Sequence, residues 1–396
     1  MPDLLTMDDA RAAILARIRP LQAERISVES AAGRVLAESA AAAVDLPPFP
    51  SSAMDGFAVR SDDTPGHLPV VAEIAAGRPA DRPLASGEAM AIATGGVVPE
   101  GADAVVPIEL VVLQDNSVEV PGVAAGTNVR PQGGDLLAGS TVVRAGALLG
   151  PAQLGALAAA GIAEAVCART PRVAVLATGT ELRQPGEPLG AGEIYEANSL
   201  ILSAQLTAAG ADVERLTAVE DTEVAHRLAL ERGLGHDVLI TSGGVSMGPH
   251  DLVRRVEAEL GVEEVFWGVA VKPGKPLSFG LRGQTLVFGL PGNPVSSLVT
   301  FELFVRPAIE ALQGLAEPGP HFELGVLNGT AKRNPHRAEL ARARSQRSDE
   351  GVRLELIRGQ ESHMIARAAE ADALVLLPAG EGTIEAGASV RYLRLR

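Results

Sequence analysis

The chain has 396 residues, of which 46% are hydrophobic and 3% aromatic, and its formal net charge is −15. This length predicts several domains with aliphatic cores. The acidic balance argues against a nucleic-acid-binding protein, because phosphate backbones attract a basic face. The single cysteine, Cys167, excludes a disulfide framework and a thiolate metal cluster. With no signal-peptide pattern and no run of about 20 uncharged apolar residues, the sequence predicts a cytoplasmic protein without a membrane span.

The first residues predict a helix over residues 6–18. Thr6 has the side chain of a helix cap, and Asp8 and Asp9 would lie in the first turn, where the helix dipole favours negative charge. Apolar residues recur behind them at helical spacing. Residues 25–42 then predict a short strand followed by a further helical stretch.

Short β-branched runs, separated by Gly and Pro, fill residues 47–146. This texture is typical of a small all-β domain. Residues 151–160 return to a helix, with Pro151 suited to its first turn. We therefore predict that the β domain is inserted into a helical linker domain formed by residues 1–46 and 147–170.

Residues 171–318 alternate between predicted strands and predicted helices. The strands are expected over 172–177, 212–219, 237–241 and 285–289, and the helices over 198–209, 221–232, 251–260 and 294–312. This alternation predicts a central doubly wound, mainly parallel α/β domain with helices on both faces. Residues 319–396 predict a small C-terminal β domain, so the fold class is multidomain, α/β and β.

Unusual loops follow three of the predicted strands, at the edge of a doubly wound sheet where ligands bind. They are Thr178-Gly179-Thr180-Glu181, Ser242-Gly243-Gly244-Val245-Ser246-Met247-Gly248 and Leu290-Pro291-Gly292-Asn293-Pro294. Backbone N–H groups and hydroxyls of the second loop could cradle a phosphate. It lacks the lysine of a P-loop, and a plain strand-to-helix turn explains its glycines equally well.

Two carboxylates close to these loops have alternative interpretations. Asp221 and Asp251 each precede a predicted helix, so each could hold a metal ion or simply cap its helix. Asn293 likewise has the position of a cap. Among the histidines, His250 neighbours the glycine loop, whereas His226 falls within a predicted helix and is expected at the surface.

The lysines are unevenly distributed. The chain has three lysines against 31 arginines, and Lys272 and Lys275 lie together in Lys-Pro-Gly-Lys-Pro. Lysine offers a compact point charge where arginine offers a planar fork. The loop therefore predicts an anion site, with a solvated turn as the alternative. In the β domain, Asp55, Thr94 and Asp135 lie beside glycines, where turns are the ordinary interpretation.

Together these motifs resemble the molybdopterin molybdenumtransferase family, which includes the gephyrin E domain. The matching segments are residues 47–60, 94–106, 133–135, 178–182, 242–251, 272–276 and 289–296. Each motif is weak alone, but seven in order, across nearly the whole chain, are specific. The chain departs from the common pattern at Pro50 and Ser51, where relatives often carry Asp and Asn. It also has Thr180 where Asp is common, which leaves open how metal binding and proton transfer are divided between Glu181 and its neighbours.

The resemblance implies four domains and a homodimer whose active site is shared between subunits. It implies that adenylylated molybdopterin and molybdate give molybdenum cofactor and AMP, assisted by Mg²⁺. The substrate could be handed over by the molybdopterin adenylyltransferase. The site is expected beyond the strand ends, where a cation would polarise the scissile phosphoryl oxygen.

The resemblance also assigns roles to individual residues. Catalytic roles are implied for Asp55, Thr94, Asp135, Glu181, Asp221, Asp251, Lys272 and Lys275. The metal ligands would be Asp251, Asp221 and Glu181. The substrate-binding residues would be Thr178, Gly179, Ser242, Gly243, Gly244, Ser246, Pro291, Gly292, Asn293, Arg337, Arg342 and Ser362.

Two alternatives remain open from the sequence. One is a non-catalytic scaffold of gephyrin type that binds a partner peptide. The other is a nucleotide or pyrophosphate hydrolase that uses only the central domain. Release of AMP, measured with and without molybdate, would separate all three functions.

Overall fold

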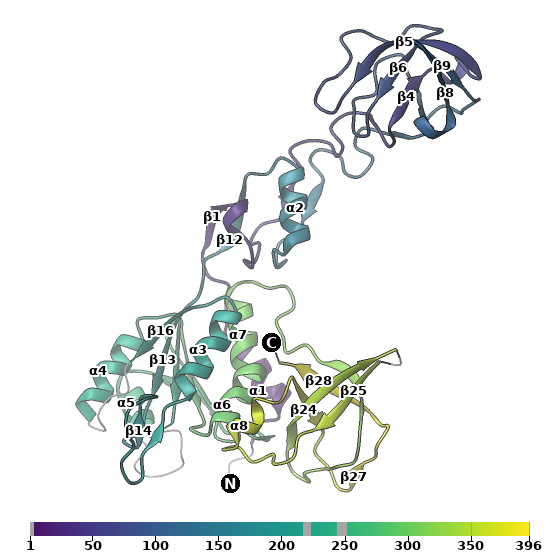
Figure 1. Cartoon of the computed structure of the whole chain (residues 1–396). Helices are drawn as coiled ribbons and strands as arrows, with labels where there is room; N and C mark the ends of the chain where they lie inside the picture. The colour runs from purple at the N-terminus through teal and green to yellow at the C-terminus, as the bar shows by residue number, and fades with distance from the viewer. Residues whose placement is uncertain (1–3, 217–222, 244–251, 350, 396) are drawn as a thin grey trace. The chain divides into compact units, whose positions relative to one another are not determined.

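The structure is a computed structural model that describes residues 4–216, 223–243, 252–349 and 351–395 (Figure 1). The chain forms two compact units. The larger unit comprises Met1–Glu24, Gly33–Ala37 and Cys167–Arg396, and the smaller comprises Arg25–Ala32 and Glu38–Val166. None of the helices within the described ranges is long and apolar enough to cross a membrane.

The smaller unit is built on a six-stranded sheet in the order β7-β4-β6-β5-β9-β8. Its strands are β4 (Gly56–Val59), β5 (Gly66–Ile74), β6 (Ala89–Ile92), β7 (Ala104–Pro107), β8 (Val112–Gln114) and β9 (Ser117–Val120). Side chains alternate across the sheet. Phe57 and Val59 therefore enter one apolar cluster, while Ala58 enters the other. The unit has the β texture that the sequence predicts.

Other elements of the smaller unit are short. Its helix is α2 (Pro151–Ala159), which begins with the predicted proline. Small paired strands are β2 (Ala40–Ala41) with β11 (Thr141–Val143), and β3 (Ser51–Ser52) with β10 (Val129–Arg130). Strands β1 (Ala23–Ser27) and β12 (Glu164–Ala168) lie at the ends of the unit in the sequence.

The helical stretch predicted within residues 25–42 is wrong. A single 3₁₀ turn, η1 (Val28–Ser30), follows β1. Gly33 then adopts a positive φ of 73°, which interrupts a helix, and Leu36 forms an antiparallel bridge with Cys167. The apolar residues of this segment are therefore buried while the backbone around them is extended rather than helical.

Helix α1 (Met7–Leu15) confirms the first predicted helix and its cap. The Asp9 backbone N–H donates to the Thr6 hydroxyl over 3.1 Å. The helix ends at Leu15, before the predicted Ile18, because the Arg17 and Ile18 N–H groups bond three residues back in tighter turns. It packs against α7 of the larger unit, whereas α2 belongs to the smaller unit. The four-domain boundaries predicted above remain a prediction.

The larger unit is centred on a second six-stranded sheet, in the order β16-β13-β17-β21-β20-β18. Its strands are β13 (Arg172–Ala177), β16 (Asp212–Leu216), β17 (Val238–Ser242), β18 (Glu263–Trp267), β20 (Ser278–Arg282) and β21 (Thr285–Leu290). The first four strands in this order are parallel, as predicted. Two antiparallel strands, β20 and β18, extend the sheet and were not predicted.

Helices cover both faces of this sheet, which agrees with the doubly wound prediction. Along β13, Val173 and Val175 pack with α3 and α6, whereas Ala174 and Leu176 pack with α4 and α5. The helices are α3 (Asn198–Ala208), α4 (Glu223–Gly233), α5 (Leu252–Glu259) and α6 (Pro294–Thr300). A small pair, β14 (Leu182–Arg183) with β15 (Ile194–Tyr195), precedes α3.

The helix predicted over residues 294–312 is interrupted. A π-helical segment, Phe301–Val305, separates α6 from α7 (Arg306–Leu312). Gln205 donates to the Leu298 carbonyl over 3.3 Å and to the Glu302 carboxylate over 2.7 Å. A side chain bound into the helical ladder is a recognised cause of such a break.

The C-terminal residues form a third sheet, in the order β19-β24-β25-β22-β28-β26. Its strands are β19 (Val271–Lys272), β22 (Glu323–Leu327), β24 (Ala338–Ser348), β25 (Gly351–Leu356), β26 (Ala373–Leu377) and β28 (Ser389–Arg394). The same part of the chain contains helix α8 (Ile365–Ala368) and a separate strand pair, β23 (Ala331–Lys332) with β27 (Thr383–Ile384). Leu340, Leu374 and Leu393 join the same apolar cluster as Val299 and Phe304. The C-terminal sheet and the α/β domain therefore share one core.

Candidate functional site

A cavity of about 490 Å³ lies at the carboxyl ends of β13, β17 and β21, within the range of about 300–1,000 Å³ typical of small-molecule sites. Helices α3, α5 and α6 begin at its wall. Seven residues that the sequence singled out line it: Thr178, Gly179, Glu181, Ser242, Gly243, Gly292 and Asn293. The structure thus brings the three predicted loops together around one space.

Close backbone contact between two of these loops depends on Gly243. The Thr178 N–H donates to the Ser242 carbonyl over 3.0 Å. Gly243 has a φ of +92°, and a Cβ added there would lie 2.6 Å from the Thr178 carbonyl oxygen. Any other residue would force the loops apart, so this glycine is required by packing and by backbone conformation.

A buried polar network fixes the same edge of the sheet. The Asn198 amide donates to the Ser242 hydroxyl over 2.9 Å and to the Gly292 carbonyl over 2.7 Å. The Ser297 hydroxyl donates to the Pro291 carbonyl over 2.8 Å. These bonds tie α3 and α6 to the loops after β17 and β21. Nothing in the sequence marked Asn198 as a site residue beyond its place at the start of a predicted helix.

Some predicted residues lie outside the described ranges, namely Asp221, Gly244, Ser246, His250 and Asp251. The choice between metal binding and capping for the two aspartates therefore remains a prediction. Among the described residues, no group of three or more His, Cys, Asp or Glu side chains is placed to hold a metal ion. Glu181, the third predicted ligand, is exposed at the cavity wall.

Two histidines line the cavity, and neither was predicted to do so. The surface position expected for His226 is wrong, because this residue is only 2% exposed. It shares the inward face of α4 with Leu230 and Gly233, at helical spacing. His363 reaches the cavity from the C-terminal domain, beside the predicted Ser362, whose carbonyl accepts the Val295 N–H over 3.1 Å.

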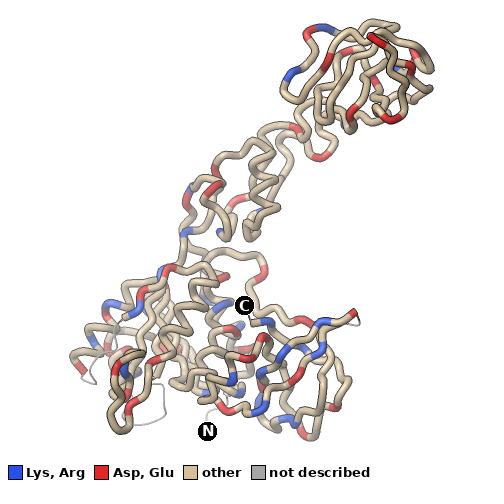
Figure 2. The backbone as a smooth tube through the Cα atoms, in the orientation of Figure 1, with Lys and Arg blue, Asp and Glu red and all other residues tan. Residues whose placement is uncertain are grey.

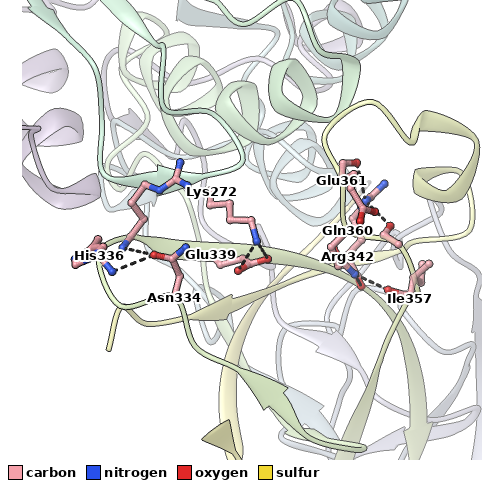
Figure 3. A network of polar contacts seen from close by, with 10 residues as sticks. Lys272, Asn334, His336, Glu339, Arg342, Ile357, Gln360 and Glu361 are labelled. Carbon is pink, nitrogen blue, oxygen red and sulfur yellow. Dashed lines mark hydrogen bonds and ion pairs between the residues drawn. The ribbon is translucent and has the colours of Figure 1, made fainter. Parts of the chain in front are cut away.

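The guanidinium of Arg342 holds the loop that carries His363. It donates to the Met364 and Gly359 carbonyls, each over 2.7 Å, and to the Glu361 carbonyl over 3.2 Å (Figure 3). Arg342 is 1% exposed, and its burial lowers the pKa of the guanidinium. These contacts give Arg342 a loop-fixing role; the direct substrate contact implied by the resemblance remains a prediction.

The lysine loop is absent from the described wall of the cavity. Lys272 pairs with Glu339 over 3.1 Å, where β19 runs parallel to β24 (Figure 3). Lys275 is half-buried. The predicted Arg337 donates its backbone N–H to the Asn334 side chain over 3.0 Å. Lys272 and Arg337 thus lie at the C-terminal sheet. The substrate contacts of Lys272, Lys275 and Arg337 remain predictions.

In the smaller unit, Asp55 and Thr94 lie together. The Thr94 N–H donates to the Asp55 carboxylate over 2.6 Å. This backbone hydrogen bond, with a second one from the Thr94 side chain, lowers the pKa of Asp55, so the carboxylate is ionised at neutral pH. Asp135 is exposed, and its backbone N–H donates to the Leu46 carbonyl over 2.9 Å.

Three family models match consecutive parts of the chain. They are the MoeA N-terminal region (domain I and II) over residues 5–161, a probable molybdopterin binding domain over residues 174–311, and the MoeA C-terminal region (domain IV) over residues 325–395. The cavity lies mainly within the second of these matches.

Two curated relatives are named as molybdopterin molybdenumtransferases. The chain is 35% identical to the molybdopterin molybdenumtransferase of Haemophilus influenzae, over 98% of both chains. It is 39% identical to molybdopterin molybdenumtransferase 2 of Mycobacterium tuberculosis, over 77% of this chain and 79% of the relative. The crystal structure of a molybdopterin biosynthesis moeA protein from Pyrococcus horikoshii OT3 matches with a TM-score of 0.86 at 26% identity, covering 99% of this chain and 100% of that one. The predicted resemblance is confirmed, and the chain belongs to the molybdopterin molybdenumtransferase family.

Proposed function

We propose that this enzyme inserts molybdenum from molybdate into adenylylated molybdopterin, which yields molybdenum cofactor and AMP. The cavity at the carboxyl ends of β13, β17 and β21 carries this proposal, because it lies mainly in the segment that matches a molybdopterin-binding domain. Two helices of eight or more residues, α3 and α5, begin there, and helix N-termini favour phosphate groups.

Each loop around the cavity has a role in this proposal. The hydroxyls of Thr178, Ser242 and Ser246 and the backbone of Gly243 and Gly244 would bind the pyrophosphate. Pro291, Gly292 and Asn293 would close the opposite side. The buried amide of Asn198 holds the two sides at a fixed separation, so the substrate meets a preorganised wall.

Mg²⁺ is the cation that suits the carboxylates proposed here. Glu181 presents an exposed carboxylate at the cavity, and carboxylate oxygens are hard ligands of the kind that Mg²⁺ prefers. Asp221 and Asp251 would complete the set. When bound, the cation would polarise the phosphoryl oxygen of the bond that breaks.

Molybdate would be bound by the lysine loop. Glu339 is 11% exposed and holds the Lys272 ammonium in one place, while the Lys272 side chain remains 42% exposed. An ammonium that is anchored on one side and open on the other can bind a tetrahedral dianion. Lys275, Arg337 and Ser362 would surround it from the lysine loop and the C-terminal domain, and Arg342 would hold the loop that carries Ser362.

The remaining proposals concern assembly and location. Asp55, Thr94 and Asp135 belong to the smaller unit, and we place them in the active site of a second subunit, within a homodimer. We also propose a cytoplasmic enzyme that receives its substrate from the molybdopterin adenylyltransferase.

Release of AMP from adenylylated molybdopterin tests the function. The purified chain should release AMP quickly only when molybdate is present. Equal release without molybdate would indicate a pyrophosphate hydrolase instead, and no release under either condition would indicate a non-catalytic scaffold.

A further inference from the structure

The cavity that we assign to the adenylylated substrate has an unexpected charge pattern. None of the described residues that line it is a lysine or an arginine. Residues 217–222 and 244–251, which border it in the sequence, contain none either. The wall does contain two carboxylates, Glu181 and Glu196. Besides the cation and the helix N-termini proposed above, any positive charge that this wall offers to an anionic pyrophosphate must therefore come from another kind of side chain.

Histidine is the remaining source of positive charge on this wall. His226 is 2% exposed and already has a partner on the protein. His363 is exposed and lines the cavity from the opposite domain. Among the described histidines of the wall, the imidazole that is open to a ligand is therefore that of His363.

The backbone that carries His363 is firmly held against the cavity. The neighbouring Ser362 carbonyl accepts the Val295 N–H in the first turn of α6, over 3.1 Å. On the other side, Arg342 donates to the Met364 carbonyl and to the Glu361 carbonyl, the latter beside it in Figure 3. Because the backbone on both sides of His363 is already held in place, this residue loses little conformational entropy when it binds a ligand, which favours a role in recognition.

We propose that the His363 imidazolium binds a phosphate of the adenylyl group in the cavity. The identity of this ligand rests on the function proposed above. In its charged form the ring donates a charge-assisted hydrogen bond to a phosphate oxygen. The C-terminal domain thereby supplies positive charge that the α/β domain lacks along the described cavity wall.

Other charged groups surround this ring. Glu181, Glu196 and His226 line the same cavity on the α/β domain. On the C-terminal side, the charged neighbours are Glu361, Arg342 and Arg367, and Asp251 and His250 lie outside the described residues.

Binding of adenylylated molybdopterin to the full chain, measured without molybdate, tests the proposal. Affinity should be higher at about pH 6 than at about pH 8, since histidine loses its charge over this interval. His363→Gln should weaken binding about tenfold or more at the lower pH and abolish the pH dependence. His363→Lys should restore affinity at both pH values, because it supplies a permanent charge.

His67→Gln is the matched control, since His67 is an exposed histidine of the smaller unit that bonds Ser117 over 3.0 Å. It should bind like the unmodified chain. If the unmodified chain binds the substrate and His363→Gln binds it equally well with the same pH dependence, the His363 proposal is overturned alone. If the unmodified chain does not bind the substrate, the proposed function fails, and the inference with it.

Discussion

At the scale of single residues, the structure separates side chains that hold the site from side chains that are free to act. Asn198 and Arg342 are buried and use their donors on protein oxygens. Glu181 and His363 are exposed at the same cavity. Substitution of the first pair should therefore affect folding and substrate binding together, whereas substitution of the second pair should affect binding with the fold intact.

Asp251 provides a test between capping and metal binding. Asn caps a helix as well as Asp does, so Asp251→Asn should leave the thermal midpoint nearly unchanged. If the carboxylate holds the cation, the same change should greatly slow molybdate-dependent AMP release. The measurements are a thermal melt and an AMP assay at saturating Mg²⁺. Normal turnover in this variant would rule out the metal role.

Sequence reasoning identified much of the cavity at this scale, because glycines and small polar residues after buried strands mark the ligand edge of a doubly wound sheet. It did not find His226 or His363. The burial of His226 depends on which face of α4 meets the sheet. The position of His363 depends on how a loop from the C-terminal domain packs on α6. Both are set by tertiary packing between distant segments, which a local pattern does not encode.

At the scale of elements, an ion pair secures the end of the parallel sheet opposite the cavity. The Asp237 carboxylate, directly before β17, accepts from Arg169 over 2.5 and 2.7 Å and from the Arg172 N–H over 2.8 Å. Burial raises the pKa of Asp237, but these hydrogen bonds outweigh it and lower the pKa below its usual value. The contribution to stability is therefore present above the unfolded-state pKa of about 3.9 and is lost as pH falls through the folded-state value.

Asp237→Asn should reveal this contribution. We expect the free energy of unfolding to fall by about 1–2 kcal/mol at neutral pH, a range that allows for the partial exposure of Arg169. The difference from the unmodified chain should shrink at acidic pH, as the pH falls through the folded-state pKa, which lies below the unfolded-state value. Urea titrations at both pH values measure it. Asp212→Asn, an exposed change on β16 of the same sheet, is the control and should have little effect at either pH.

The lysine loop is an element whose charge and shape can be tested separately. Lys275→Gln removes the charge, and Lys275→Arg keeps the charge but adds a bulky planar head. Both should weaken molybdate use by about 10- to 150-fold, while binding of the adenylylated pterin changes much less. Cofactor formation against molybdate concentration measures the first effect. If both variants used molybdate normally, the anion-binding role would be contradicted, and the loop would be a stiff, solvated turn.

At the scale of the whole molecule, charge is unevenly divided. The smaller unit has 16 acidic and 6 basic residues, whereas residues 319–396 hold 12 of the 34 lysines and arginines (Figure 2). The smaller unit is therefore unsuited to attract an anionic substrate by itself. If Asp55 and Thr94 take part in catalysis, the positive charge that an anionic substrate requires must come from residues outside the smaller unit.

Mixed dimers test the homodimer proposed above. Asp55→Ala and Asp251→Ala should each be inactive alone, since each lacks one half of the proposed site. After subunit exchange, a hybrid dimer would contain one site with neither substitution, so part of the activity should return. The AMP assay before and after mixing measures the recovery. Absence of recovery, with exchange verified by differently tagged subunits, would contradict a site shared between subunits.

The apolar cluster shared by the α/β domain and the C-terminal sheet also limits how this gene can be divided or fused. Residue 319 looks like a natural junction in the sequence, but Leu340, Leu374 and Leu393 complete the core on its far side. A chain truncated there would expose Val299 and Phe304, and a large exposed apolar face promotes aggregation. The C-terminal sheet and the α/β domain should therefore be expressed together. A gene fusion or recombination event that keeps the fold would have to exchange both parts at once.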